Sequence, residues 1–162
     1  MPQRVAVYAG SFDPITNGHL DLARRATALF DRVVLAVGHN PAKKTTLSLE
    51  TRMEVMRQAT AHLPTVEIDS FQGLLVHYCR RMGATAILRG LRAVTDFEFE
   101  FQIGLANMDM APEVQTVFLL TEPSNIFISS SLVREIATNG GDVRRYLPAA
   151  AFQALQQAIS QG

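Results

Sequence analysis

Short apolar runs alternate with longer amphipathic stretches along almost the whole chain. The apolar runs predict strands over residues 5–9, 32–37, 65–68, 86–88 and 116–120. The stretches that follow them predict helices over residues 18–30, 49–62, 73–82, 97–108, 130–138 and 148–159. Strands that alternate with helices form right-handed crossovers. We therefore expect an α/β fold in which a parallel sheet of five strands is covered by helices on both faces.

Residues at the ends of the predicted helices support this fold class. Ser48 is a suitable N-cap for the helix that begins at residue 49, and Glu50 places a negative charge in its first turn. Gly140 and Gly141 are typical of a helix end. The chain has 162 residues, 48% of them hydrophobic, and no repeat, low-complexity tract or linker interrupts it. We therefore expect one domain over residues 1–162.

Polar segments follow every predicted strand. They are residues 10–19 after the first strand, His39, Lys43 and Lys44 after the second, and residues 71–73, 89–92 and 121–131 after the other three. In open parallel sheets, ligands bind beyond the carboxyl ends of the strands. All five segments are therefore expected to share one edge of the sheet.

The segment at residues 10–19 has the composition of a phosphate-binding loop. It runs from a strand into a helix, and His19 falls in the first turn of that helix, where unpaired N–H groups and the helix dipole favour an anion. It lacks the Gly-Lys-Ser/Thr of a Walker A loop and the Gly-x-Gly-x-x-Gly dinucleotide fingerprint. A plain turn is the alternative, since Gly, Pro and Asn are common turn residues. The full string with His19 favours phosphate binding.

Three other segments each allow a functional and a structural interpretation. Lys43 and Lys44 could reach a phosphate, although paired surface lysines are usually solvated. Arg89 and Arg92 are suited to phosphate contact, although ion pairs with Asp96, Glu98 or Glu100 are a serious alternative, which we leave open here. Residues 128–131 open a helix with three serines, which could form a second anion cradle or simply an N-cap. Together they indicate nucleotide binding and phosphoryl or nucleotidyl transfer.

Composition narrows the classes of partner and compartment. Fifteen basic and fifteen acidic residues cancel, so no overall positive field favours nucleic acid or an anionic membrane. Cys79 is the only cysteine, and no signal peptide or membrane-spanning run is apparent, so we expect a cytoplasmic protein. The four histidines and Cys79 lack metal-ligand spacing, and no arrangement of residues indicates a covalent nucleophile.

Three separated motifs resemble a known family. GSFDP at residues 10–14, followed by TNGH at 16–19, is similar to the first motif of the nucleotidyltransferases with an HxGH-type signature. ISSSLVR at residues 128–134 is similar to their second motif. RGLRAVTDFEFE at residues 89–100 resembles the specific element of the bacterial phosphopantetheine adenylyltransferases, and the likeness covers essentially the whole chain.

The resemblance implies a Rossmann-like fold and an activity. The reaction would transfer AMP from ATP to 4′-phosphopantetheine, giving dephospho-coenzyme A and pyrophosphate in coenzyme A biosynthesis. The acceptor phosphate would attack the α-phosphorus in line, a reaction that needs positioning and charge stabilisation, with Mg²⁺ accompanying ATP. The resemblance also implies a homohexamer, feedback by coenzyme A, and no nucleic-acid or membrane partner.

The resemblance also assigns roles to residues. The catalytic residues would be His19, Lys43 and Arg92. The ATP-binding residues would be Ser11, Phe12, His19, Gly90, Leu91, Arg92, Glu100, Asn125, Ile126, Phe127, Ile128, Ser129, Ser130 and Ser131. The substrate-binding residues would be Ser11, Lys43, Leu75, Arg89, Asn107 and Glu135. No residue is implied as a metal ligand.

The chain departs from the family pattern at three places. Ser11 replaces a frequent threonine, Phe99 a frequent tyrosine, and Asn125-Ile126 a segment that often holds a tryptophan, so adenine packing there is expected to differ.

One alternative is another enzyme of the superfamily, using nicotinate mononucleotide or glycerol 3-phosphate with ATP or CTP. A nucleotide-sensing or nucleic-acid-binding module is another. The segment 89–100 argues against the first, and the neutral charge and His19 argue against the second.

Overall fold

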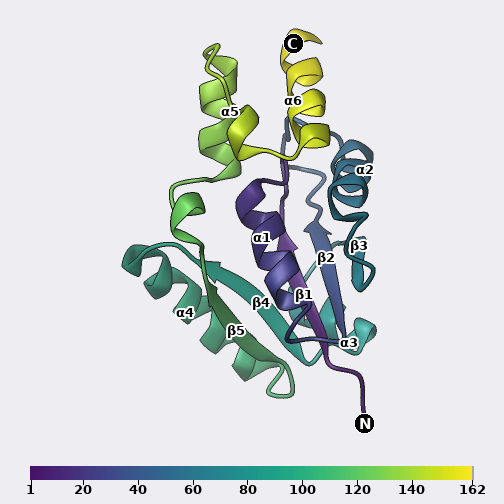
Figure 1. Cartoon of the computed structure of the whole chain (residues 1–162). Coiled ribbons are helices and arrows are strands. Elements are labelled where there is room, and N and C mark those ends of the chain that lie inside the picture. The colour runs from purple at the N-terminus through teal and green to yellow at the C-terminus, as the bar shows by residue number, and fades with distance from the viewer. Residues whose placement is uncertain (162) are drawn as a thin grey trace.

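The computed structural model describes residues 1–161 and has a five-stranded parallel sheet at its centre (Figure 1). The strands are β1 (Val5–Gly10), β2 (Arg32–Gly38), β3 (Val66–Phe71), β4 (Ala86–Leu91) and β5 (Gln115–Leu120), in the order β3-β2-β1-β4-β5. The helices are α1 (Asn17–Ala26), α2 (Leu49–Thr60), α3 (Leu75–Met82), α4 (Val94–Met110), α5 (Ser130–Thr138) and α6 (Ala149–Gln161). Short 3₁₀ turns lie at η1 (Pro123–Asn125) and η2 (Arg144–Tyr146). The predicted fold class is confirmed.

The strand order reverses between β1 and β4, and the two strands separate there. β1 pairs with β2 over six residue pairs, but with β4 only at Ala6–Ala86 and Val7–Ile87. Beyond these pairs, toward their carboxyl ends, β1 and β4 no longer form a ladder. A reversal of strand order is where open parallel sheets bind ligands. The sheet therefore opens at the edge where the sequence places its polar segments.

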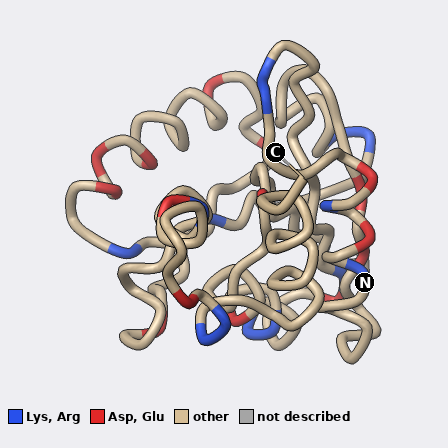
Figure 2. Tube along the Cα trace, turned by 90° about the horizontal axis from the view of Figure 1, so that it is seen from above, with Lys and Arg blue, Asp and Glu red and all other residues tan. Residues whose placement is uncertain are grey.

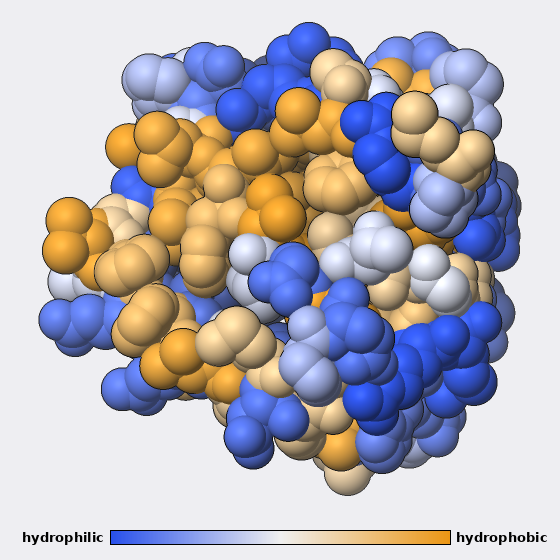
Figure 3. All heavy atoms as spheres, turned by 90° about the horizontal axis from the view of Figure 1, so that it is seen from below, coloured by the Kyte–Doolittle hydropathy of each residue, from blue (hydrophilic) through white to orange (hydrophobic). Residues whose placement is uncertain are grey.

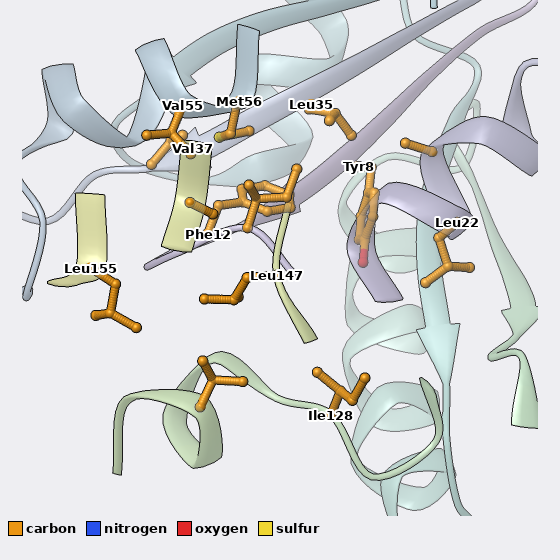
Figure 4. Packing of buried hydrophobic residues seen from close by; sticks show 14 of the residues in the cluster. Tyr8, Phe12, Leu22, Leu35, Val37, Val55, Met56, Ile128, Leu147 and Leu155 are labelled. Atoms are coloured by element: carbon orange, nitrogen blue, oxygen red, sulfur yellow. The ribbon is translucent and has the colours of Figure 1, made fainter. Parts of the chain in front are cut away.

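Both faces of the sheet are buried, as alternating strand residues show. Val33, Leu35 and Val37 of β2 face one core, on the side of α1, α2, α5 and α6. Val34 and Ala36 face the other, on the side of α3. Figure 4 shows the first of these cores, in which the ring of Phe12 lies among side chains from several elements. The loop after β1 is thus anchored by a fully buried aromatic side chain.

The observed helix ends differ modestly from the predicted ones. Ser48 caps α2 as expected, its hydroxyl accepting a hydrogen bond from the Thr51 amide at 3.1 Å. α4 begins three residues earlier than predicted, at Val94, so Asp96 falls in its first turn, where a carboxylate is favourable. β4 runs on through Leu91, so Arg89 and Gly90 belong to the strand rather than to the loop after it. Pairing with β5 extends the strand beyond its short apolar run.

One long helix stands apart from the rest in its surface character. α4 exposes a set of large apolar side chains: Val94, Phe97, Phe99, Phe101, Leu105, Met108 and Met110. The space-filling view from below shows apolar surface gathered on the side of α4 and β5 (Figure 3). Elsewhere acidic and basic residues are interspersed (Figure 2). None of the helices within residues 1–161 is long and apolar enough to cross a membrane.

Candidate active site

A cavity of about 340 Å³ lies where β1 and β4 separate, a size within the range of small-molecule sites. The end of β1 and its following loop, the first turn of α1, the end of β4, the start of α4 and the segment before α5 form its walls. Three segments that are far apart in the sequence, residues 8–22, 89–100 and 121–130, therefore meet at one place. We call this space the nucleotide cavity, because its groups are suited to a polyphosphate.

Two arginines hold the loop after β1 by its backbone. Phe12 has a left-handed backbone, with φ of 45°, which costs roughly 1–2 kcal/mol in a residue with a side chain. Arg52 Nη1 of α2 donates to the Ser11 carbonyl at 2.8 Å, and Arg134 Nη1 of α5 donates to the Asp13 carbonyl at 2.6 Å. The carbonyls on both sides of Phe12 are thus fixed by charged donors, which keeps the loop in this conformation.

The Asp13 side chain connects this loop to the next polar segment. Its carboxylate is buried and accepts hydrogen bonds from the Thr46 amide at 2.9 Å and the Leu47 amide at 2.8 Å. Those amides end the loop that carries Lys43. Asp13 therefore ties the lysine loop to the loop after β1, and part of the predicted convergence has a direct structural cause.

His19 is held in one orientation and one tautomer. Its Nδ1 accepts from the Thr16 amide at 3.0 Å, while the Thr16 hydroxyl accepts from the His19 amide at 3.3 Å, a reciprocal capping box. The rings of Phe12 and Tyr8 lie beside the imidazole, at 5.1 and 6.1 Å between centroids. Since Nδ1 accepts this hydrogen bond, the neutral ring carries its own proton on Nε2. His19 therefore presents an N–H donor to the cavity, whose wall it forms.

The charge state of His19 is set by its surroundings. Burial, and then the nearby positive charges of Arg92 and Arg89, lower the pKa of His19 to about 4. The imidazole is therefore neutral at physiological pH. It acts as a hydrogen-bond donor without carrying a positive charge.

Two helices begin at this cavity. Gly18 and His19 at the start of α1, and Ser129 and Ser130 at the start of α5, all line it. Neither helix has an acidic residue in its first turn. Their unpaired N–H groups and positive dipole ends are therefore available to an anion. The Ser130 hydroxyl donates to the Pro14 carbonyl at 2.8 Å, which holds the two helix starts together.

Arg89 fills the opening between the two strands. Its guanidinium forms two hydrogen bonds to the Glu100 carboxylate, at 2.7 and 2.6 Å, and a third from Nη1 to the Ala9 carbonyl at 3.1 Å. The last bond gives a β1 carbonyl the partner that β4 no longer supplies. Arg92 is held more loosely, with Nε at 3.4 Å from Asp96 and Nη1 at 3.1 Å from the Ile128 carbonyl. The structural alternative of ion pairs is thus realised at both arginines.

Gly90 allows another part of the chain to pack closely against its backbone. A Cβ atom there would lie 2.5 Å from Leu22 Cδ1, and Leu22 is buried in α1. The family resemblance implies an ATP contact at this glycine. The structure places α1 there, although Gly90 also lines the cavity.

A second cavity, of about 720 Å³, lies beyond the ends of β2 and β3. Lys43, Arg52, Leu75 and Asn107 are among the residues that line it. We call it the acceptor cavity, because the family resemblance implies that Ser11 and Lys43, which line it, bind the acceptor. Ser11 also lines it, and within residues 1–161 Ser11 is the one residue shared with the nucleotide cavity. A group bound at Ser11 is therefore accessible from both sides.

The structure brings most of the predicted site residues to these two cavities. The nucleotide cavity is lined by Ser11, Phe12, His19, Arg89, Gly90, Arg92, Glu100, Asn125, Ile128, Ser129 and Ser130, and the acceptor cavity by Ser11, Lys43, Leu75 and Asn107. Arg89 thus lies on the nucleotide side, although the resemblance implied a role for it on the acceptor side. The predicted residues that line neither are Leu91, Ile126, Phe127, Ser131 and Glu135. The roles of all these residues, inside and outside the cavities, remain predictions.

Two polar residues at the site carry no role in the sequence analysis. Asp13 stands inside the first motif, but its contact with the lysine loop spans 33 and 34 positions and no local pattern indicates it. Arg52 left a clearer signal. It is buried together with Val55, Met56 and Thr60 on one face of α2, so it is a charged residue at a position of the apolar stripe.

Comparisons with known proteins agree with this geometry. The sequence model of the cytidylyltransferase-like family matches residues 7–136. A phosphopantetheine adenylyltransferase of Heliobacterium modesticaldum is 53% identical over 146 residues, 90% of this chain and 87% of the relative. One of Herpetosiphon aurantiacus is 52% identical over 154 residues, 95% of this chain and 93% of the relative.

A solved structure extends the comparison to the fold. The putative nicotinate-nucleotide adenylyltransferase from Vibrio parahaemolyticus superposes with a TM-score of 0.72 at 16% identity, covering 95% of this chain and 99% of that one. At this level of identity the likeness concerns the fold alone. It agrees with the parallel sheet and its flanking helices.

Proposed function

This chain belongs to the cytidylyltransferase-like family and, within it, to the phosphopantetheine adenylyltransferases, and from that membership we propose the reaction that it catalyses. AMP passes from ATP to 4′-phosphopantetheine, giving dephospho-coenzyme A and pyrophosphate, a step of coenzyme A biosynthesis. The observation that carries the proposal is the position of Ser11 between the two cavities. A nucleotide on one side and a phosphorylated acceptor on the other would meet there.

The proposed chemistry is a single displacement. An oxygen of the acceptor phosphate forms a bond to the α-phosphorus, the bond from that phosphorus to the bridging oxygen breaks, and pyrophosphate leaves with the electron pair. Ser11 and Lys43 would hold the acceptor phosphate, while His19 Nε2–H would donate to the phosphate on which charge develops. The starts of α1 and α5 would hold the remaining phosphates. Arg92 would add guanidinium N–H donors beside them.

Magnesium would enter with the triphosphate rather than at a site built by the protein. Within residues 1–161 no group of three or more histidine, cysteine, aspartate or glutamate side chains could hold a metal ion. The carboxylates beside the nucleotide cavity, Asp96 and Glu100, each pair with an arginine. Mg²⁺ is commonly bound by substrate phosphates and water, where it neutralises phosphate charge.

Release of pyrophosphate tests the proposal directly. ATP should be turned over with 4′-phosphopantetheine, and only weakly with nicotinate mononucleotide or glycerol 3-phosphate. CTP should replace ATP poorly. Equal turnover with nicotinate mononucleotide would assign the chain to a different acceptor, and no pyrophosphate with any acceptor would favour a binding module.

We also propose a homohexamer of single-domain subunits. The support is the exposed apolar side chains of α4, which a neighbouring copy could cover (Figure 3). Light scattering at micromolar concentration checks it, and a stable monomer would refute it.

Feedback by coenzyme A belongs to the same proposal, since coenzyme A contains both the nucleotide and the pantetheine parts. The cytoplasmic location expected from the sequence remains a prediction.

A further inference from the structure

The acceptor cavity has a buried positive charge in its wall. Arg52 lies on α2 with only 2% of its surface exposed, and that residual surface opens into the acceptor cavity. Its known contacts are two carbonyls, that of Ser11 at 2.8 Å from Nη1 and that of Ser48 at 3.4 Å from Nε. Neither carbonyl carries a charge.

Arg52 has no acidic partner. Among residues 1–161, no aspartate or glutamate oxygen lies within 4.0 Å of its guanidinium, whereas the guanidinium of Arg89 donates two hydrogen bonds to the Glu100 carboxylate. Asp13, the buried acid of the neighbouring loop, is occupied by the two amides of the lysine loop and lies 3.8 Å from Arg134. A buried charge without a counter-charge is costly. An anion bound from outside the chain would offset that cost.

The second η nitrogen of Arg52 is the group that such an anion would meet. Within residues 1–161 Nη2 donates no hydrogen bond, yet every fully buried side-chain nitrogen or oxygen there has a partner. Nη2 therefore retains accessible surface, and the space that Arg52 lines is the acceptor cavity. Ser11, whose carbonyl Arg52 holds, and Lys43 line the same cavity.

We propose that Arg52 is a further binding residue for the phosphate of the acceptor, a phosphomonoester, which it would contact through Nη2 from the α2 side while Lys43 approaches from the loop. The inference rests on the proposed function for the identity of the acceptor. The guanidinium has a second effect, because Nη1 fixes the Ser11 carbonyl beside the same phosphate. A phosphomonoester supplies the two negative charges that Lys43 and Arg52 together match.

A pair of ligands that differ only by the phosphate tests this role. Calorimetric titration of 4′-phosphopantetheine and of pantetheine should be carried out on the wild type, on Arg52→Gln and on Arg57→Gln. Arg57 lies on the same helix but is exposed and pairs with Glu54, so it is the matched control. Arg52→Gln should weaken the binding of 4′-phosphopantetheine by about 10- to 100-fold, the range for the loss of one hydrogen bond to a charged group. The binding of pantetheine, which lacks the phosphate, should weaken far less.

The outcomes separate a binding role from a structural one. The proposal would be overturned if Arg52→Gln weakened the binding of both ligands equally, or of neither. If Arg52→Gln does not fold, Arg52→Lys keeps the charge but not the planar fork, and it should still weaken the phosphorylated ligand selectively.

The same experiment separates failure of this inference from failure of the proposed function. If the wild type binds neither compound, the proposed acceptor is wrong, and inorganic phosphate becomes the probe. Phosphate should then raise the Tm of the wild type and of Arg57→Gln more than that of Arg52→Gln. Equal stabilisation of all three would overturn the assignment of an anion to Arg52.

Discussion

The two cavities on either side of Ser11 differ in whether their positively charged side chains have acidic partners. In the nucleotide cavity, Arg89 is bound by Glu100 and Arg92 lies 3.4 Å from Asp96. In the acceptor cavity, Lys43 and Arg52 have no acidic partner within residues 1–161. The nucleotide side instead presents the starts of two helices and a neutral histidine.

The difference indicates how each half of the reaction would be stabilised. A paired guanidinium contributes mainly fixed geometry, because its carboxylate already neutralises its charge. Unpaired charges attract an anion directly. We therefore expect the nucleotide side to depend on oriented donors, and the acceptor side on net charge.

The largest expected effect concerns the oriented donor. His19→Ala should lower kcat by about 10²–10³-fold, or roughly 3–4 kcal/mol, with a much smaller change in the KM for ATP, because the donor acts most strongly on developing charge. Steady-state kinetics beside a melting curve checks this. His19→Gln is the control: glutamine can restore the capping box to Thr16 and hence stability, but not the position of Nε2–H. A folded His19→Ala enzyme with wild-type kcat would mean that the loop is a structural turn without a catalytic role.

The next effect concerns the paired arginine. Glu100→Gln should lower the free energy of unfolding by about 2 kcal/mol, because it leaves Arg89 part-buried without its counter-charge. Chemical denaturation measures this. Glu98→Gln, an exposed acid two residues away, should change stability by less than about 0.5 kcal/mol. Similar stability of both variants would mean that the Arg89 pair contributes no more than a surface pair.

A smaller effect is expected on the acceptor side. Lys43→Gln should raise the KM for the acceptor about 10-fold through loss of one charged contact, while stability stays within about 0.5 kcal/mol because Lys43 is exposed. Lys44→Gln, next to it but outside the cavity lining, should leave the KM nearly unchanged. Kinetics with varied acceptor at saturating ATP measures both. Equal effects at the two lysines would argue for general attraction rather than a defined contact.

The smallest expected change in kcat is its pH dependence on the nucleotide side. With the His19 pKa lowered to about 4, kcat should show no His19 titration from about pH 6 to about pH 8. The unfolded chain binds that proton at its ordinary pKa of 6.5, so the stability His19 confers is complete above pH 6.5 and is lost as pH falls toward about 4. Proton NMR of the imidazole and pH-dependent denaturation test both points. An imidazole that titrates near 6.5 in the folded protein would contradict this account.

The sequence by itself determined the order of elements and the edge that carries the chemistry. The predicted strands and helices all occur, because hydrophobic periodicity and caps such as Ser48 are local properties. Parallel crossovers then place every polar segment after a strand at one edge of the sheet. The convergence of Ser11, His19 and Ser130 on one cavity follows from that rule.

Only the tertiary structure decided how the charges at that edge are shared. Local spacing left three acids open for the two arginines, and packing of α4 against β4 and β5 selected Glu100 for Arg89. Glu135 of α5 lies outside both cavities, and only the meeting of α2 with the loop after β1 revealed Arg52. Electrostatic partners are chosen by distances in space, which a periodic pattern along the chain does not contain.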